Sequence, residues 1–138
     1  MSVLAGGWKQ LSAFFWARVR SFRYAFQGWW YVIRTQKNAW IHAIASAGVV
    51  LLALWLSLPA RDWAVLVLTI ALVWSAEFFN TSIEAVVDLA SPAHHPLAKV
   101  GKDVGAAAVL IAAGAAVLVG LLVLGPPLWA RISPWLPF

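Results

Sequence analysis

The stretch AEFFNTSIEAVVDLASPAHHPLAKVGKD, residues 76–103, carries the features that decide the fold. It holds four of the chain's five acidic residues and follows directly on an apolar run. Polar side chains recur in its first half at steps of three and four, which places them on one face of a helix: Glu77, Asn80, Thr81, Glu84 and Asp88. A short break of serine, proline and histidine separates them from Lys99, Lys102 and Asp103. Acids that can hold a metal ion and cations that can hold phosphate therefore lie close together in the sequence.

The overall composition is that of a membrane protein. The chain has 138 residues, of which 63% are hydrophobic and 11% charged, and its mean hydropathy is +0.83. A soluble domain of this length is less apolar, so we expect an all-α integral membrane protein whose single domain spans residues 1–138. Cysteine is absent, which excludes disulfides and thiolate chemistry. Because so short a chain buries little core of its own, a symmetric oligomer is expected.

The N-terminal part, residues 8–34, has the pattern of an amphipathic helix. One face is aromatic and aliphatic, the other carries most of the basic residues, and Arg18 is the exception on the apolar side. Such a helix suits the headgroup layer of a membrane, and packing of a soluble helix against a partner is the weaker alternative. Its lipid-like face argues against a nucleic-acid-binding protein.

Three membrane spans follow, at about residues 40–58, 63–88 and 98–124. In the tight turn between the first two spans, Pro59 predicts the end of one helix and Asp62 the cap of the next. In the third span, Gly101 and Gly105 form a G-x-x-x-G pair that allows close helix contact. The tail, residues 125–138, carries four prolines and is expected along the membrane surface. Since most basic residues gather on one side, the N-terminus and residues 88–103 are predicted to be cytoplasmic and the C-terminus outside.

The acids permit a structural and a chemical interpretation. Glu77 lies about 22 Å along the second span, where a carboxylate costs about 2.5 kcal/mol or more. It is either paired within the bundle or a general base for a lipid hydroxyl. Glu84 lies two turns further on, at a depth where it can bind Mg²⁺, and Asn80 lies between them. The alternative for Glu84 and Asp88 is a solvated helix end.

The residues after the break also have two interpretations. Lys99 suits an anchor to anionic headgroups, whereas Lys102 beside Asp103 can hold a phosphate oxygen. His94 and His95 make a poor zinc site without cysteine or a third nearby histidine. No glycine-rich phosphate loop is present. The residues are therefore consistent with metal-assisted phosphoryl transfer to a lipid.

Two segments resemble the signature of the prokaryotic diacylglycerol kinase family. They are EFFNTSIEAVVD, residues 77–88, and HHPLAKVGKD, residues 94–103, and weaker matches extend the resemblance over residues 21–113. These upstream matches include Arg34, Thr35, Asn38 and His42. The HHPLAK form is most similar to the Gram-positive-type branch, which includes undecaprenol kinases.

The resemblance implies a homotrimer in the bacterial plasma membrane, with a surface helix, three spans and active sites shared between subunits. It implies MgATP as co-substrate and a membrane lipid, undecaprenol or diacylglycerol, as acceptor. Glu77 would be the general base, Asn80 would support it at the substrate, and Glu84 would bind Mg²⁺. The nucleotide would be held by Tyr24, Gln36, Asn80, Glu84, Ala93, His94, His95, Lys102 and Asp103, with Asp88 and Lys99 in support.

The chain departs from the family pattern at Gln36 and near Ala17, where some members place an arginine that is absent here. Gln36 stands where members usually have a second metal-binding glutamate, so a two-metal site is in question. An uncharged amide oxygen can bind Mg²⁺, but with lower affinity. This departure leaves open a non-catalytic lipid-binding or scaffold trimer of the same fold. We favour the kinase because the other expected acids, amides and lysines are present together.

Overall fold

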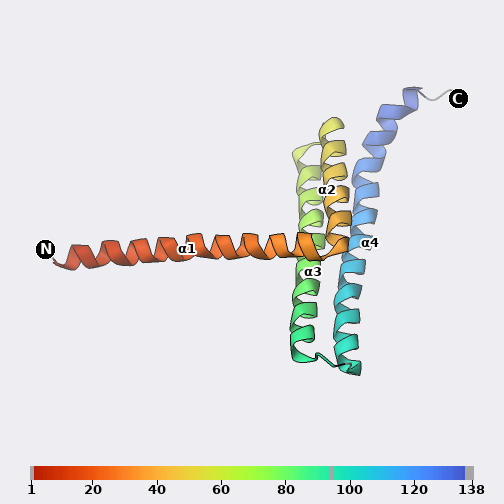
Figure 1. Cartoon of the computed structure of the whole chain (residues 1–138). Coiled ribbons are helices and arrows are strands. Elements are labelled where there is room, and N and C mark those ends of the chain that lie inside the picture. Colours follow the sequence, from red (N-terminus) through yellow and green to blue (C-terminus); the bar gives the residue numbers. More distant parts are fainter. Residues whose placement is uncertain (1, 94, 136–138) are drawn as a thin grey trace. The chain divides into compact units, whose positions relative to one another are not determined.

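The computed structural model describes residues 2–93 and 95–135, with side chains from residue 14 onward, and is helical throughout its regular elements (Figure 1). The elements are α1 (Ser2–Thr35), α2 (Lys37–Trp55), α3 (Ala60–Ala90), α4 (Pro96–Ile132) and a short 3₁₀ helix, η1 (Ser133–Trp135). The chain divides into two units, residues 1–35 and 36–138. The predicted all-α class is confirmed.

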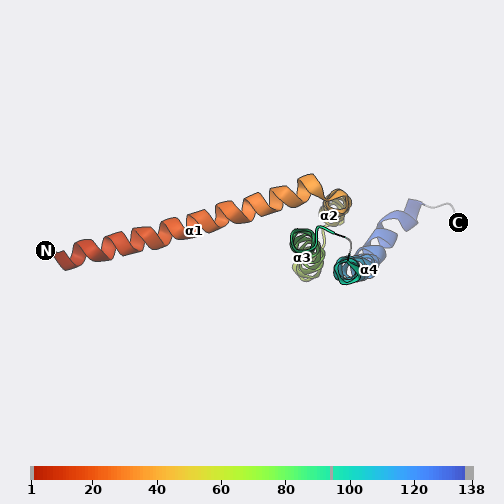
Figure 2. The same cartoon turned by 60° about the horizontal axis from the view of Figure 1, so that its bottom comes forward.

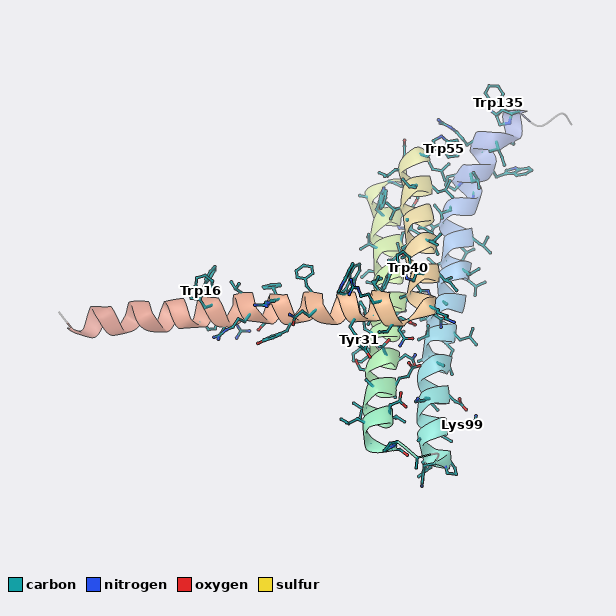
Figure 3. All side chains as sticks on the ribbon, viewed as in Figure 1. Trp16, Tyr31, Trp40, Trp55, Lys99 and Trp135 are labelled. Carbon is teal, nitrogen blue, oxygen red and sulfur yellow. The ribbon has the colours of Figure 1, made fainter. Side chains whose placement is uncertain are left out.

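The first unit is the single helix α1, which is amphipathic as predicted. Its aromatic side chains stand out from the helix, as Trp16 and Tyr31 show in Figure 3, and both are more than half exposed. Arg18, the exception on the apolar side, places its guanidinium 4.8 Å from the centre of the Phe14 ring one turn earlier. This cation–π contact shields the charge, so Arg18 fits an otherwise aromatic face.

The second unit contains three helices long and apolar enough to span a membrane, as predicted. Figures 1 and 2 show α2, α3 and α4 side by side. The 19 residues of α2 reach about 28 Å, close to the thickness of a hydrocarbon layer. The 31 residues of α3 reach about 46 Å, so α3 exceeds that thickness. The α3–α4 hairpin extends beyond the N-terminal end of α2 (Figure 1).

The connection from α2 to α3 is a tight turn. Ser57 takes a left-handed conformation, φ 54°, and the Leu58 amide donates to the carbonyl of Ala53 at 3.2 Å. Pro59 then precedes α3, whose N-terminus has no side-chain cap. The prediction that Asp62 caps this helix is wrong, because α3 already begins at Ala60. Asp62 lies in the first turn, where its charge favours the helix dipole.

The helices α3 and α4 pack closely at Gly105. A methyl group added there would lie 2.5 Å from Oδ1 of Asn80, whereas one added at Gly101 would lie 3.6 Å from Val87. The close contact expected from the G-x-x-x-G pair is therefore present, and it is tightest at Gly105. This contact matters for function because Asn80 belongs to the site described below.

The C-terminal helix is longer than the sequence predicted. We expected it to end at Leu124 and a tail to follow, but α4 continues to Ile132 through Pro126 and Pro127. Proline fixes φ near the helical value, so it can remain in a helix at the expense of a hydrogen bond. The last turns lean away from α2 and α3 (Figure 2). Arg131 stacks over Trp55, 5.5 Å from the ring centre, and ties this extension to the end of α2.

Candidate functional site

Glu77 is the most deeply buried large side chain among the described residues. It lies on α3 with 1% of its surface exposed. Nε2 of His42, on α2, lies 3.7 Å from Oε2 of Glu77, which is too far for a hydrogen bond. Both carboxylate oxygens and this histidine nitrogen are buried and, within the described residues, have no hydrogen-bond partner. Because unsatisfied buried polar groups are costly, the arrangement fits a ligand that brings its own donor.

Glu84 is held by two amides. Nδ2 of Asn80 donates to one carboxylate oxygen at 3.0 Å, and Nε2 of Gln36 donates to the other at 3.1 Å. Asn80 lies one turn earlier on α3, whereas Gln36 immediately precedes α2 with an extended backbone. Oδ1 of Asn80 is buried without a hydrogen-bond partner among the described residues. The structure therefore brings Gln36, Asn80 and Glu84 together, and the metal role predicted for Glu84 and Gln36 stays a prediction.

The lysines predicted to contact nucleotide form ion pairs near the α3–α4 connection. Lys102 pairs with Asp88 across the two helices, and Lys99 pairs with Asp103 one turn further along α4. Lys102 therefore pairs with Asp88, and not with Asp103 beside it in the sequence. All four side chains are exposed by more than a third, so each pair contributes at most about 1 kcal/mol. Such weak pairs can be exchanged for contacts to a phosphate.

Two hydrogen bonds stabilise the described residues between α3 and α4. Ser91 donates to the carbonyl of Ala93 at 2.9 Å, and Nδ1 of His95 accepts from the Leu97 amide at 3.2 Å. His95 thus caps α4. His94 lies outside the described residues. Tyr24 lies exposed on α1, in the separate unit, so its predicted contact with nucleotide stays a prediction.

An apolar groove of about 480 Å³ runs between α2, α3 and α4. Most of its lining is aliphatic, and its polar side chains are those of His42, Ser46 and Thr69. His42 therefore contacts the groove as well as the surroundings of Glu77. No role was predicted for His42, although it is a polar imidazole within a predicted span, residues 40–58, that holds no lysine, arginine or acid. That was the signal that pointed to it.

The donor set around Glu84 fits one magnesium ion. Within the part of the chain that the structure describes, no three of the His, Cys, Asp and Glu side chains cluster as metal ligands. Mg²⁺ can bind with fewer protein ligands than three, because it commonly takes one or two carboxylates and completes its shell with water and phosphate oxygens. The Glu84 carboxylate offers about four lone-pair directions, of which the two amides use two. The amide oxygens of Gln36 and Asn80 are further possible ligands.

Comparison with known proteins gives a family. Residues 23–124 match the sequence profile of the prokaryotic diacylglycerol kinases. A diacylglycerol kinase of Synechocystis sp. is 49% identical over 109 residues, which cover 78% of this chain and 62% of that relative, slightly under two thirds of its length. An undecaprenol kinase of Bacillus subtilis is 38% identical over 119 residues, which cover 86% of this chain and 94% of the relative. A diacylglycerol kinase of Escherichia coli is 39% identical over 95 residues, 64% of this chain and 78% of the relative.

The matched region contains α2, α3 and most of α4, together with Glu77, Glu84 and the residues around them. The extent of this match and the identity to the relatives lead to one conclusion. The chain belongs to the prokaryotic diacylglycerol kinase family, a family of membrane lipid kinases.

Proposed function

We propose that this protein transfers the γ-phosphate of ATP to the hydroxyl group of a membrane lipid, undecaprenol or diacylglycerol, and releases the lipid monophosphate and ADP. The observation that carries the proposal is the buried Glu77 carboxylate, which has no hydrogen-bond partner among the described residues. An unpaired carboxylate within a membrane span is retained at a cost, which makes a functional role the default interpretation. A lipid hydroxyl is a donor that would satisfy it.

Glu77 is the proposed general base. As the lipid oxygen attacks the γ-phosphorus, its O–H bond breaks and the proton passes to a carboxylate oxygen of Glu77. The bond between the γ-phosphorus and the leaving oxygen of ADP breaks, so the phosphoryl group and one proton are accounted for. Asn80, one turn beyond Glu77 on α3, is proposed to help orient the acceptor.

Glu84 is the proposed ligand of Mg²⁺, with Gln36 and Asn80 beside it. When bound, the ion would supply positive charge that neutralises the phosphate oxygens of ATP. The hydrogen bonds from the two amides hold the Glu84 carboxylate in a fixed orientation, which supports this role.

The nucleotide is proposed to lie near the α3–α4 connection. Lys102 and Asp103 would contact its polar groups, with Asp88 and Lys99 as their supporting ion-pair partners. The resemblance to the family also implies that Tyr24, on the surface helix, and the loop segment 93–95 contact the nucleotide. These contacts rest on the resemblance of the motif, and each is testable by substitution.

The proposed setting is a bacterial plasma membrane, with the whole chain forming one kinase domain in a homotrimer. In this orientation the N-terminus and the site are cytoplasmic and the C-terminus is outside. The distribution of charge supports it, because Lys99 and Lys102 lie at one end of the three-helix unit, and the opposite end, marked by Trp55, carries Arg61 and Arg131 (Figure 3). Many large apolar side chains of α2, α3 and α4 are exposed, which suits contact with lipid and with further subunits.

Between the two acceptors we favour undecaprenol, because the HHPLAK motif resembles the branch that includes undecaprenol kinases. The named relatives include both activities, so the choice needs an experiment. Purified protein in nanodiscs would receive labelled ATP, saturating Mg²⁺ and each lipid in parallel. Labelled undecaprenyl phosphate as the main product supports the proposal, and labelled phosphatidic acid would change the acceptor. Wild-type protein that is folded but labels neither lipid would refute the kinase function.

A further inference from the structure

The pair formed by Glu77 and His42 has a feature that the general-base role leaves unexplained. Glu77 must lose the proton that it takes from each acceptor before it can act again. Only 1% of its side chain is exposed, so water has little direct access to it. The facing Nε2 of His42, 3.7 Å away, is the nearby group that can accept this proton.

His42 is held in this orientation by its neighbours. The Trp74 ring stands edge-on to the imidazole, with ring centres 6.3 Å apart and planes inclined by 67°. Nε1 of Trp74 donates to Oγ of Ser46 at 3.3 Å, which fixes the indole in turn. His42 itself is 12% exposed and lines the groove between the helices. It therefore connects a carboxylate that is almost inaccessible with a more open part of the molecule.

The separation of the two groups argues against a purely structural ion pair. In a structural His–Glu ion pair, the ring nitrogen and a carboxylate oxygen would lie within hydrogen-bond distance, so both groups would have a partner. Here Nε2 of His42 and both oxygens of Glu77 are buried without partners within the described part of the chain. Contacts of catalytic groups are often long in the absence of substrate and tighten when it binds.

We propose that His42 is a positioning residue that relays the proton from Glu77. The proposal rests on the kinase function and on Glu77 as its base. The acceptor O–H bond breaks, its proton moves to Glu77, and the lipid oxygen takes the phosphoryl group. The proton then moves from Glu77 to the Nε2 lone pair of neutral His42, whose other proton is on Nδ1. The imidazolium then releases its Nδ1 proton to water, and tautomer exchange returns the remaining proton from Nε2 to Nδ1, so each turnover ends with a charged Glu77 and His42 in its starting form.

The other groups that face this pair are few. Glu84 lies two turns further along α3, where two amides hold it. The residues that α4 contributes to the groove are apolar. Histidine is suited to the relay because its neutral ring accepts a proton on one nitrogen and carries a proton that it can release on the other.

The test compares His42→Gln and His42→Ala with wild type in nanodiscs. Both variants are expected to lower kcat about 100-fold, while KM for ATP and for the lipid stays within about twofold. Both variants should also change the shape of the kcat–pH profile relative to wild type, because the relay group is missing. Added imidazole should restore turnover to His42→Ala in a saturable way, because the groove beside residue 42 can admit it. Thr69→Ala is the matched control and should retain kcat, because Thr69 lines the same groove while its hydroxyl donates to the Val65 carbonyl of its own helix.

Three results would overturn the relay. They are a wild-type kcat in His42→Gln, an unchanged pH profile, or a loss of activity in His42→Ala that imidazole does not restore. Thermal unfolding of each variant separates loss of fold from loss of the relay. Failure of the relay is distinct from failure of the kinase function: an active wild type and an inactive Glu77→Gln leave the function standing, whatever His42 does.

Discussion

Substitution of Gly105 by alanine tests whether the close contact between α3 and α4 controls the site. The new Cβ would lie 2.5 Å from Oδ1 of Asn80, 3.5 Å from its Cγ and 3.8 Å from its Cα. Carbon and oxygen normally approach to about 3.3 Å, so Oδ1 must retreat by about 0.8 Å. The same amide donates to Glu84 at 3.0 Å, and a shift of this size turns that donor away.

The expected effect follows from two opposing terms. Loss of a hydrogen bond to a charged group costs about 1.5–3 kcal/mol, and the better helix propensity of alanine returns about 1 kcal/mol. Gly105→Ala should therefore lower the free energy of unfolding by about 0.5–2 kcal/mol. If the amide orients Glu84 for Mg²⁺, activity or apparent metal affinity should fall about 10–100-fold. The assay is ATP-dependent lipid phosphorylation over a series of Mg²⁺ concentrations, with thermal unfolding in detergent alongside.

Gly101→Ala is the matched control. Its Cβ would meet only Val87, at an ordinary 3.6 Å, so activity and stability should stay near wild type. A double-mutant cycle with Asn80→Ala sharpens the test, because Gly105→Ala should cost little once the clashing side chain is gone. The reasoning is refuted if Gly105→Ala behaves like Gly101→Ala, or if the losses from Gly105→Ala and Asn80→Ala simply add.

Three further predictions concern the charged groups. Glu77→Gln should lower turnover by about 10²–10⁴-fold, because the general base is lost. Its thermal stability should be equal to wild type or higher, because the substitution removes a buried carboxylate that has no partner among the described residues. A stable variant with wild-type turnover would show that Glu77 is not the base. Gln36→Glu should lower the Mg²⁺ concentration needed for half-maximal activity, because it adds a second carboxylate beside Glu84. The two carboxylates repel each other without a cation, so thermal stability should come to depend on Mg²⁺. A melting temperature that does not change with Mg²⁺ would count against a metal site here. Lys102→Met should raise the KM for ATP more than Lys99→Met does. Each substitution should change the free energy of unfolding by at most about 1 kcal/mol, because both ion pairs are exposed. Equal KM values for the two variants would contradict the nucleotide-contact role of Lys102.

Much of the fold could be predicted from local pattern. The run from Trp63 through Glu84 keeps helical spacing, and the break before Pro96 marks the α3–α4 connection, so the sequence predicted the three long helices. The end of α4 was missed because prolines usually end helices, yet Pro126 and Pro127 are accommodated inside this one. The cap by Asp62 was wrong because the helix starts two residues earlier.

The contacts of the site were less accessible from the sequence. Periodicity puts Glu77 and Glu84 on one face of α3, but it does not say which residues of other helices face them. The hydrogen bond from Gln36 to Glu84 joins residues 48 apart, and the approach of His42 to Glu77 depends on how α2 is rotated against α3. Local patterns carry no information on such rotations. The chemical roles of these residues stay predictions that the experiments above test.

The hydrogen bonds that hold Glu84 matter for how a metal ion would enter and leave the proposed site. Gln36 and Asn80 hold this carboxylate with neutral groups, so its negative charge is oriented without being cancelled, as a lysine would cancel it. Each amide also carries an oxygen, and a half-turn about its last side-chain bond replaces a donor with an acceptor. If Glu84 binds Mg²⁺ as proposed, the same two side chains would hold the bare carboxylate and then turn their oxygens toward the ion. Loading and release of the ion would then need rotation of two amides and no movement of the helices.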